Sequence, residues 1–277
     1  MPSDTAVVMA AHNAERTIRQ AVVSVLDGTQ PCDIFIVDDA SRIPVTVALS
    51  SLAHRVTVIR LDENVGPGGA RNAALKRILA ADYKYVAIMD ADDISHSTRL
   101  AVQRGFLESH PKVGVVGTWV RLFDERTGET VYSLHRATDS DTIRKLMYLN
   151  IGLSHATAML RADALREVGI YDAGFAAAED YELMRRIGTR YDFANIPECL
   201  LSYRISPNGQ SRGRRLRQLY DRLRTQLRYF DPLAWRAWTG VIKTALVMLI
   251  PSGLAEPLKL RSKGLGTPGA AFPVNKA

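Results

Sequence analysis

Apolar residues in the first hundred positions form short runs, separated by longer stretches with helical spacing. The runs are residues 5–10, 33–38, 56–61 and 84–89. Between the first two runs, apolar residues recur at i, i+3, i+4, i+7 and i+8, on one face of a helix: Ile18, Ala21, Val22, Val25 and Leu26. This alternation predicts parallel β-α-β units, with two further helices over residues 45–53 and 69–81.

The first predicted helix has a candidate start at Asn13. An Asn side chain can accept a hydrogen bond from the free backbone N–H groups of a first turn, which makes it a good N-cap. Glu15 would then lie in the first turn, where the helix dipole favours negative charge. We therefore predict that the helix begins directly after Asn13.

After about residue 110 the alternation gives way to shorter elements. "VGVVGTWVRLF" and "ETVYSL" have the composition of strands, with a turn at Thr127-Gly128 between them. Helices are expected near residues 140–149 and 161–168, with the strand-like "HATAML" between them. The chain contains no internal repeat and no low-complexity tract, so we expect a second half that extends the first.

The positive charge of the chain is concentrated at its C-terminal end. The 277 residues carry a net charge of +7 in an ordinary globular composition, 47% hydrophobic and 23% charged. Residues 212–277 contain 13 Lys and Arg against 3 Asp and Glu, a net +10, which leaves −3 for the first 211 residues. Because the basic character belongs to the tail, we expect no nucleic-acid partner for the main domain.

Cysteine content and the first residues indicate the compartment. Cys32 and Cys199 are too few for a disulfide scaffold or a zinc site, and they fit reduced thiols. Asp4 lies where a signal peptide would be basic, and the apolar run that follows has only the length of a strand. We expect a cytoplasmic protein without an export signal.

Polar residues follow every predicted strand in the first half. These strand ends read Ala10-Ala11-His12, Asp38-Asp39, Asp62-Glu63-Asn64 and Asp90-Ala91-Asp92-Asp93. The carboxyl ends of parallel strands meet at one edge of a sheet, where ligands of open α/β folds bind. A single Asp at such a place usually starts a turn or caps a helix. So many acids at one edge favour a binding site instead.

The strand end "YVAIMDADDI" places three carboxylates within four positions. Two carboxylates about 5 Å apart repel by about 3 kcal/mol at an effective dielectric constant of about 20, so a positive partner is expected. Closely spaced carboxylate oxygens suit Mg²⁺ or Mn²⁺. With few protein ligands, such an ion would share its coordination with phosphates of a substrate.

The loop "ENVGPGGARNAALKRIL" could receive an anion at the start of the third helix, with Arg71 nearby. It is not a dinucleotide-binding motif, because the third glycine position of G-x-G-x-x-G is Arg71, and it lacks the Gly-Lys-Ser/Thr of a Walker motif. Alone, the loop is as consistent with a plain turn as with a phosphate site.

Five segments, in this order and spacing, resemble the family 2 inverting glycosyltransferases with the GT-A fold. They read "VVMAAHNAERTIRQAVVSVLDGT", "DIFIVDDAS", "NVGPGGARNAAL", "YVAIMDADD" and "AEDYELMRRI", and the likeness covers about residues 5–205. It implies an α/β fold with a Rossmann-like, mostly parallel central sheet flanked by helices. A glycosyltransferase domain would cover residues 1–211, and a helical extension residues 212–277.

The resemblance also implies roles for individual residues. The nucleotide-sugar donor, a UDP-sugar first of all, would be bound by Ala10, Ala11, His12, Glu15, Asp39, Arg71, Asp90, Ala91 and Asp92. Mn²⁺ or Mg²⁺ would be bound by Asp90, Asp92 and Asp93, with Asp92 as the first choice. Asp180, with Glu179 beside it, would be the general base, although acids also favour the first turn of the helix "EDYELMRRI" for electrostatic reasons.

Two positions carry less weight. Many relatives have Pro-Thr-Tyr-Asn where this chain has "AAHN", so Ala10 and Ala11 would contact the nucleotide through backbone atoms. His12 could contact the base, and His155 could line the donor-sugar or acceptor pocket. For both histidines a structural role, as a half-buried side chain with its hydrogen bonds satisfied, is the alternative.

The tail combines arginines with apolar and aromatic residues. Residues 212–228 have apolar residues at helical spacing among seven Arg, and "DPLAWRAWTGVIKTALVMLIPSGL" is too short and interrupted to span a bilayer. Its composition fits a helix at a membrane interface with anionic lipid, through residues 212–255. A helix packed on the domain or in a homodimer is the alternative. Residues 263–277 have the composition of a disordered end.

The chain lacks the Gln-x-x-Arg-Trp of processive polysaccharide synthases, so the family resemblance implies non-processive transfer. The acceptor would be a glycan or glycolipid in glycolipid, polysaccharide or other glycoconjugate synthesis. Two rivals remain. A haloacid-dehalogenase-like phosphatase also has a strand ending in Asp-x-Asp, but usually on its first strand. A non-enzymatic basic membrane adaptor explains the tail and leaves the acid clusters without a purpose.

Overall fold

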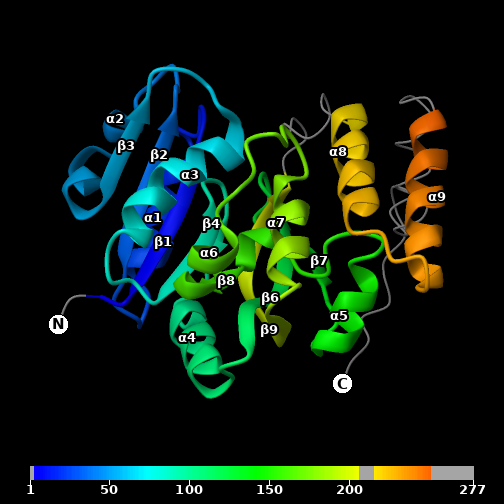
Figure 1. The fold of residues 1–277 in the computed structure, drawn as a ribbon. Helices are drawn as coiled ribbons and strands as arrows, with labels where there is room; N and C mark the ends of the chain where they lie inside the picture. The colour runs from blue at the N-terminus through cyan, green and yellow to red at the C-terminus, as the bar shows by residue number, and fades with distance from the viewer. Residues whose placement is uncertain (1–2, 206–214, 251–277) are drawn as a thin grey trace.

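The computed structural model describes residues 3–205 and 215–250 (Figure 1). Their strands form one nine-stranded sheet in the order β3-β2-β1-β4-β8-β6-β9-β5, with β7 paired to β6. The strands are β1 Thr5–Ala11, β2 Asp33–Asp39, β3 Thr57–Leu61, β4 Tyr85–Asp90, β5 Ile94–Ser95, β6 Val113–Asp124, β7 Thr130–Leu134, β8 Met159–Arg161 and β9 Asp192–Ile205.

Helices lie on both faces of this sheet (Figure 1). They are α1 Ile18–Leu26, α2 Val45–Leu49, α3 Gly66–Leu79, α4 Arg99–Ser109, α5 Ser140–Leu146, α6 Ala162–Val168, α7 Glu179–Ile187, α8 Arg215–Arg228 and α9 Trp235–Leu249, with short 3₁₀ turns at Ser50–Arg55 and His155–Thr157. The predicted helix over 45–53 is thus an α-helical turn continued by a 3₁₀ helix.

Alternation along β1 divides the core into two layers. Val8 packs with the buried face of α3 on one side of the sheet, and Met9 packs with α1 on the other. Successive strand residues point to opposite faces, so a strand covered on both sides is apolar throughout. The four predicted strands of the first half are confirmed, and β1, β2, β3 and β4 pair in parallel.

The predicted start of the first helix is wrong. α1 begins at Ile18 with Thr17 as its N-cap residue, and Glu15 is exposed ahead of it. Asn13 has a φ of 53°, and its Oδ1 accepts a hydrogen bond from the backbone N–H of Arg42 at 3.0 Å. Asn tolerates this left-handed conformation better than most residues, so it turns the chain at the strand end instead of capping the helix.

The second half continues the sheet with mixed strand directions. β8 pairs antiparallel with both β4 and β6, while β6 and β9 pair in parallel along most of their length. Next to this half, α8 lies between α7 and α9 (Figure 1). The expected domain boundary at residues 211 and 212, and the end expected to be disordered, fall outside the described residues.

Candidate active site

Strand register brings the predicted strand-end residues to one edge of the sheet. Ala11 pairs with Asp38 across β1 and β2, and Ala10 pairs with Asp90 across β1 and β4. The carboxyl ends of three parallel strands therefore meet, as the sequence predicts. Ala11 is buried and Ala10 is half-buried.

Asp38 and Asp39 are both buried, and each binds backbone N–H groups of a neighbouring loop. Asp38 accepts hydrogen bonds from the backbone N–H groups of Ser41 and Val45. Burial alone would raise the pKa of Asp38, but these bonds and the charge of Arg60 lower it. Asp39 accepts from Val65 and Gly66 at 2.8 and 3.0 Å. The two carboxylates thus hold in place the loops that border the strand ends.

His12 lies within this loop network. Its Nδ1 is 2.6 Å from the carbonyl oxygen of Asp39 and 3.0 Å from Nδ2 of Asn64. Its Nε2 is 2.8 Å from Nδ2 of Asn13. The ring is half-buried and fixed by its neighbours, which agrees with the structural alternative and leaves part of its surface accessible.

Asp90, Asp92 and Asp93 form an acidic cluster, in which each offers one carboxylate oxygen and these oxygens lie within 4.8 Å of one another. Oδ2 of Asp93 is buried and has no hydrogen-bond partner among the described residues. Burial, followed by the charges of the other two carboxylates, raises the pKa of Asp93 well above its ordinary value. Oxygen ligands so close together fit a divalent cation such as Mg²⁺ or Mn²⁺.

Arg204, at the end of β9, borders the acidic cluster. Its backbone N–H donates to Oδ1 of Asp93 at 3.3 Å, and its Nε donates to the carbonyl of Asp92 at 2.8 Å. The sequence analysis did not single out this residue, because nothing in "SYRI" shows that β9 lies beside the end of β4. Arg204 fixes the loop that presents the acids.

Arg71 connects the acidic cluster to the Glu-Asp pair predicted to contain the base. It is buried, and its Nη2 lies 2.7 Å from Oδ1 of Asp90, while its Nη1 lies 3.9 Å from Oε1 of Glu179. One guanidinium therefore stands between carboxylates that are 89 positions apart in the chain. The residues predicted for the donor side and for the base side are therefore neighbours in the fold.

Gly68 allows this close approach of α3 and α7. A Cβ atom at Gly68 would lie 2.8 Å from Cγ of Glu179 and 3.6 Å from Cβ of Tyr171. The first of these distances is shorter than real Cβ atoms show. The glycine-rich loop thus has a packing role, because it lets the first turn of α3 lie against the first turn of α7.

Glu179 and Asp180 open α7, directly after Ala178, which has a φ of 54°. Burial raises the pKa of Asp180, while the positive charges of Arg71 and Arg222 act in the opposite direction. Burial and the charge of Asp180 raise the pKa of Glu179. A carboxylate with a raised pKa accepts a proton more readily near neutral pH, which suits a general base.

His155 contacts Tyr171 beside Arg71. Its Nε2 is 2.8 Å from the Tyr171 hydroxyl, and Asn72 holds the backbone of Tyr171 through two hydrogen bonds of 2.8 and 3.0 Å. Burial, followed by the charge of Arg71, lowers the pKa of His155 well below its ordinary value. The sequence alone does not point to Tyr171, the direct partner of His155.

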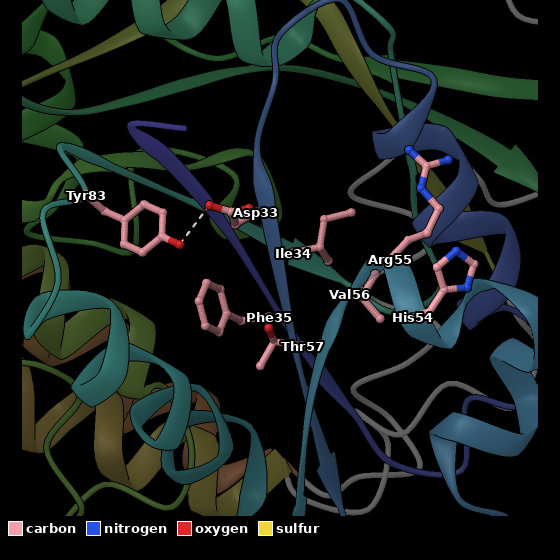
Figure 2. A pocket seen from close by; sticks show the side chains of 8 residues that line it. All are labelled: Asp33, Ile34, Phe35, His54, Arg55, Val56, Thr57 and Tyr83. Atoms are coloured by element: carbon pink, nitrogen blue, oxygen red, sulfur yellow. Dashed lines mark hydrogen bonds between the residues drawn. The ribbon is translucent and has the colours of Figure 1, made fainter. Parts of the chain in front are cut away.

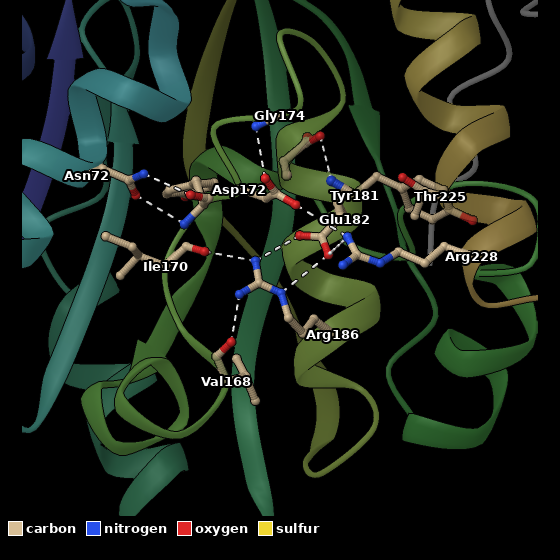
Figure 3. A network of polar contacts seen from close by, with 12 residues as sticks. Asn72, Val168, Ile170, Asp172, Gly174, Tyr181, Glu182, Arg186, Thr225 and Arg228 are labelled. Atoms are coloured by element: carbon tan, nitrogen blue, oxygen red, sulfur yellow. Dashed lines mark hydrogen bonds and ion pairs between the residues drawn. The ribbon is translucent and has the colours of Figure 1, made fainter.

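A buried charge network holds α7 in place (Figure 3). The carboxylate of Glu182 is fully buried and accepts from Arg186 at 2.8 Å and from Arg228 at 3.3 Å. Arg186 also donates to the carbonyls of Val168 and Ile170, the latter at 2.8 Å. This network ties α7 both to the end of α6 and to α8.

α8 also contacts the loop that leads to Glu179 and Asp180. Asp221 is fully buried, and its Oδ2 accepts from the backbone N–H of Ala177 at 3.0 Å. Arg224 donates to the carbonyl of Gly174 at 3.0 Å. Nε of Arg222 is buried without a hydrogen-bond partner among the described residues. The basic tail is therefore part of the surroundings of the predicted base.

A surface hollow elsewhere has no part in this site (Figure 2). Asp33 and Thr57 open β2 and β3, so the hollow lies at the opposite ends of the strands from the acidic cluster. Across it, the Tyr83 hydroxyl donates to Oδ2 of Asp33 at 2.8 Å.

Comparison with known proteins gives a consistent result. The sequence profile of glycosyl transferase family 2 matches residues 6–169. The amylovoran biosynthesis glycosyltransferase AmsE of Erwinia amylovora is 27% identical over 254 residues, which cover 88% of this chain and 91% of AmsE. An uncharacterized glycosyltransferase of Methanocaldococcus jannaschii is 28% identical over 209 residues, which cover 73% of this chain and 70% of that protein.

Solved structures share the fold. TarS of S. aureus superposes with a TM-score of 0.67 at 17% identity and covers 94% of this chain and 77% of the TarS chain. The mannosyltransferase PcManGT of Pyrobaculum calidifontis, solved with GDP-Man and Mn²⁺, gives a TM-score of 0.62 at 16% identity and covers 97% of this chain and 78% of its own. These similarities confirm the predicted α/β fold of the GT-A type.

Proposed function

The chain belongs to glycosyl transferase family 2 and is a glycosyltransferase, and from this we propose that it moves a sugar from a nucleotide-diphosphate sugar to an acceptor hydroxyl. The transfer inverts the configuration at the anomeric carbon and adds one sugar, or a few, without processive polymerisation. The observation that carries the proposal is the position of Arg71 between Asp90 and Glu179, since it joins the donor side and the base side in one site.

In this proposal Asp180 is the general base. It takes the proton of the acceptor hydroxyl while the oxygen attacks the anomeric carbon, and the nucleoside diphosphate leaves from the opposite face. The raised pKa of Asp180 supports this role. Glu179 and Arg71 hold the N-terminus of α7 in position, so the carboxylate of Asp180 keeps its orientation.

The donor lies across the carboxyl ends of the strands. Ala10 and Ala11 offer backbone groups, and His12 and Asp39 border the place for the base and ribose. Glu15 is exposed at the rim, where it can reach the outer part of the nucleotide. Arg71 places a buried positive charge next to the phosphate end of the donor.

Asp90, Asp92 and Asp93 would hold a divalent cation, with Asp92, the most exposed of the three, as the principal ligand. When bound, Mg²⁺ or Mn²⁺ supplies positive charge that stabilises a leaving diphosphate. The protein contributes the fixed loop: Arg204 holds Asp92 and Asp93, and Ala91, between Asp90 and Asp92, is buried.

The acceptor is a glycan or glycolipid in polysaccharide or glycoconjugate synthesis, in line with the name of the relative AmsE. His155, which is half-buried, forms a polar pair with the buried Tyr171 beside the site, and its accessible part can contact the transferred sugar or the acceptor.

A thermal-shift screen tests the proposal. The protein is heated with UDP, GDP and their sugar derivatives, each with Mn²⁺ and with EDTA. A ligand present at 100 times its Kd raises stability by about 2.7 kcal/mol. We expect stabilisation by one nucleotide class, and only with the metal. No response to any nucleotide, with or without metal, would contradict the proposal.

A further inference from the structure

The last described helix, α9, places its small residues inside and its large apolar residues outside. Ala237, Gly240 and Thr244 are buried against the protein. The opposite face carries exposed large side chains at spacings of three and four residues: Trp235, Trp238, Ile242, Leu246 and Leu249. A surface helix normally buries its large apolar side chains, so this arrangement needs another explanation.

The orientation of α9 is fixed by close contacts. A Cβ atom at Gly240 would lie 2.0 Å from the carbonyl oxygen of Tyr148, so only glycine permits this approach. Arg215 of α8 donates to the carbonyl of Ile250 at 3.0 Å. Phe230 packs against Trp238 edge to face, with ring centroids 4.8 Å apart. The helix therefore cannot turn its apolar face inwards without losing these contacts.

The exposed face forms a continuous apolar row. Trp235 is 63% exposed, Leu246 58% and Leu249 79%, and Leu233 just before the helix is almost fully exposed. At 1.5 Å per residue, the row from position 235 to 249 is about 21 Å long. Such an apolar row on a surface marks a docking site.

Two cations of α9 accompany the apolar row. Lys243 lies on α9 and is exposed, and Arg236 lies against the Trp235 ring at 4.6 Å. On the adjacent α8, Arg217 pairs with Asp221 and Arg224 donates to the carbonyl of Gly174, so these two cations face the base loop and not the apolar row. Residues 215–250 contain seven Lys and Arg against two Asp. A partner for this surface must tolerate both apolar and negatively charged contacts.

We propose that the outward face of α9 docks on a lipid bilayer that carries anionic headgroups. Large aliphatic side chains and two tryptophans would enter the interfacial region, and Arg236 and Lys243 of α9 would meet the headgroups. None of the helices in residues 3–205 and 215–250 is long and apolar enough to cross a membrane. Because the opposite face of α9 is packed on the protein, the docked helix would lie in the plane of the surface.

A second copy of the chain explains the surface less well. Two copies meeting through α9 would bury the apolar rows but would also bring the same cations together, and like charges in close contact are unfavourable. An anionic bilayer satisfies the apolar row and the cations together.

Docking also suggests a substrate class, and this step depends on the proposed function. The other face of the helix pair contacts the loop of the base, through Asp221 and Ala177. A membrane-bound α9 would therefore keep the active site near the bilayer surface, where a lipid-linked acceptor is concentrated. The acceptor we infer is a glycan carried on a lipid anchor.

Vesicle binding of the full chain, without donor or acceptor, tests the docking. Vesicles contain either neutral phosphatidylcholine alone or a mixture with phosphatidylglycerol, and binding is followed by sedimentation and by the blue shift of tryptophan fluorescence. We expect binding to the anionic vesicles at low salt, with quenching when the lipid chains carry bromine. Binding should weaken as salt increases, because ions screen the cations.

Matched variants locate the contact. The double variant Ile242→Gln, Leu246→Gln should lower the vesicle partition coefficient by about tenfold or more, because it removes two apolar side chains from the docking face. Both side chains are exposed, so the core of the protein stays intact. Ile43→Gln with Val47→Gln removes two exposed apolar residues far from α9 and should change nothing. Lys243→Gln should weaken only the binding to anionic vesicles.

Failure to bind anionic vesicles, or equal binding by the α9 variant and its control, would overturn the docking. So would a stable dimer that the α9 variant converts to monomer without any vesicle binding. These outcomes leave the proposed function untouched, since nucleotide binding is measured separately. Conversely, vesicle binding with no nucleotide response would overturn the proposed transfer from a nucleotide sugar and would still support the docking of α9.

Discussion

The guanidinium of Arg71 lies 2.7 Å from the carboxylate of Asp90, in a salt bridge whose cation is buried and whose acid keeps 32% of its side chain exposed. The buried end fixes the bridge in the protein, and the exposed end leaves Asp90 accessible to a ligand. This pair places the acidic cluster next to the first turn of α7.

Asp180→Asn should remove turnover and keep donor binding. Asparagine has nearly the same shape but cannot accept the acceptor's proton, and loss of a general base costs about 10²- to 10⁴-fold in rate. We expect kcat to fall by that amount while the Kd for the donor changes less than about threefold. Calorimetry and a coupled assay for nucleoside diphosphate release measure the two quantities.

Asp163→Asn provides the control, since this carboxylate is an exposed acid in the first turn of α6. It should leave kcat unchanged. Full activity of Asp180→Asn would remove Asp180 from the role of base.

Asp92→Asn should abolish the effect of metal on donor binding. The exposed carboxylate of Asp92 is the ligand that we assign first, and its loss leaves two acids, one paired with Arg71. We expect the Mn²⁺-dependent part of the thermal shift with nucleotide to disappear, while the protein without ligand keeps its melting temperature. Asp62→Asn, at the end of β3, is the control. An unchanged shift in Asp92→Asn would contradict the assignment.

Arg222→Gln should move the acidic limb of the activity profile to higher pH. The base must be deprotonated, so activity falls as pH drops through the pKa of Asp180, which burial already raises. The charge of Arg222 lowers that pKa, and its removal therefore raises the pKa further. The profile of kcat against pH measures the shift. The control is Arg77→Gln, a change at an exposed position of α3, and it should leave the acidic limb in place. An unmoved limb in Arg222→Gln would show that Arg222 does not influence the pKa of the base.

Glu182→Gln should destabilise the fold far more than a surface change of the same kind. Its carboxylate is fully buried between Arg186 and Arg228, and breaking a buried ion pair costs about 3 kcal/mol. Glu167→Gln removes an exposed partner of Arg190 and should cost about 0.5 kcal/mol. Urea unfolding measures both changes in the free energy of unfolding. Equal costs would show that the network in Figure 3 contributes little.

The strands of the first half were predictable because each has its own local signal. An apolar run that ends at acids, such as the one before Asp90, marks both the strand and its functional end. The start of α1 was not predictable in this way. Asn13 satisfies the local rule for a cap, but its side chain binds Arg42 of another loop, and that contact exists only in the folded chain.

The sequence indicates a set of candidate site residues but not the contacts between them. Sequence spacing could not show that Arg71 pairs with Asp90, or that Tyr171 pairs with His155, because these contacts join separate segments that meet only in the folded chain. Nor could composition show which side of α9 faces outwards. The close approach of Gly240 to the carbonyl of Tyr148 determines that side, and it exists only in the folded chain.

The most direct test of the central claim is the configuration of the sugar released when water replaces the acceptor. Proton NMR follows slow hydrolysis of the nucleotide sugar that the thermal screen identifies, before the released sugar equilibrates between anomers. The account predicts that the inverted anomer appears first and that Asp180→Asn suppresses its formation. First appearance of the retained anomer, or release that is equally fast in Asp180→Asn, would contradict it.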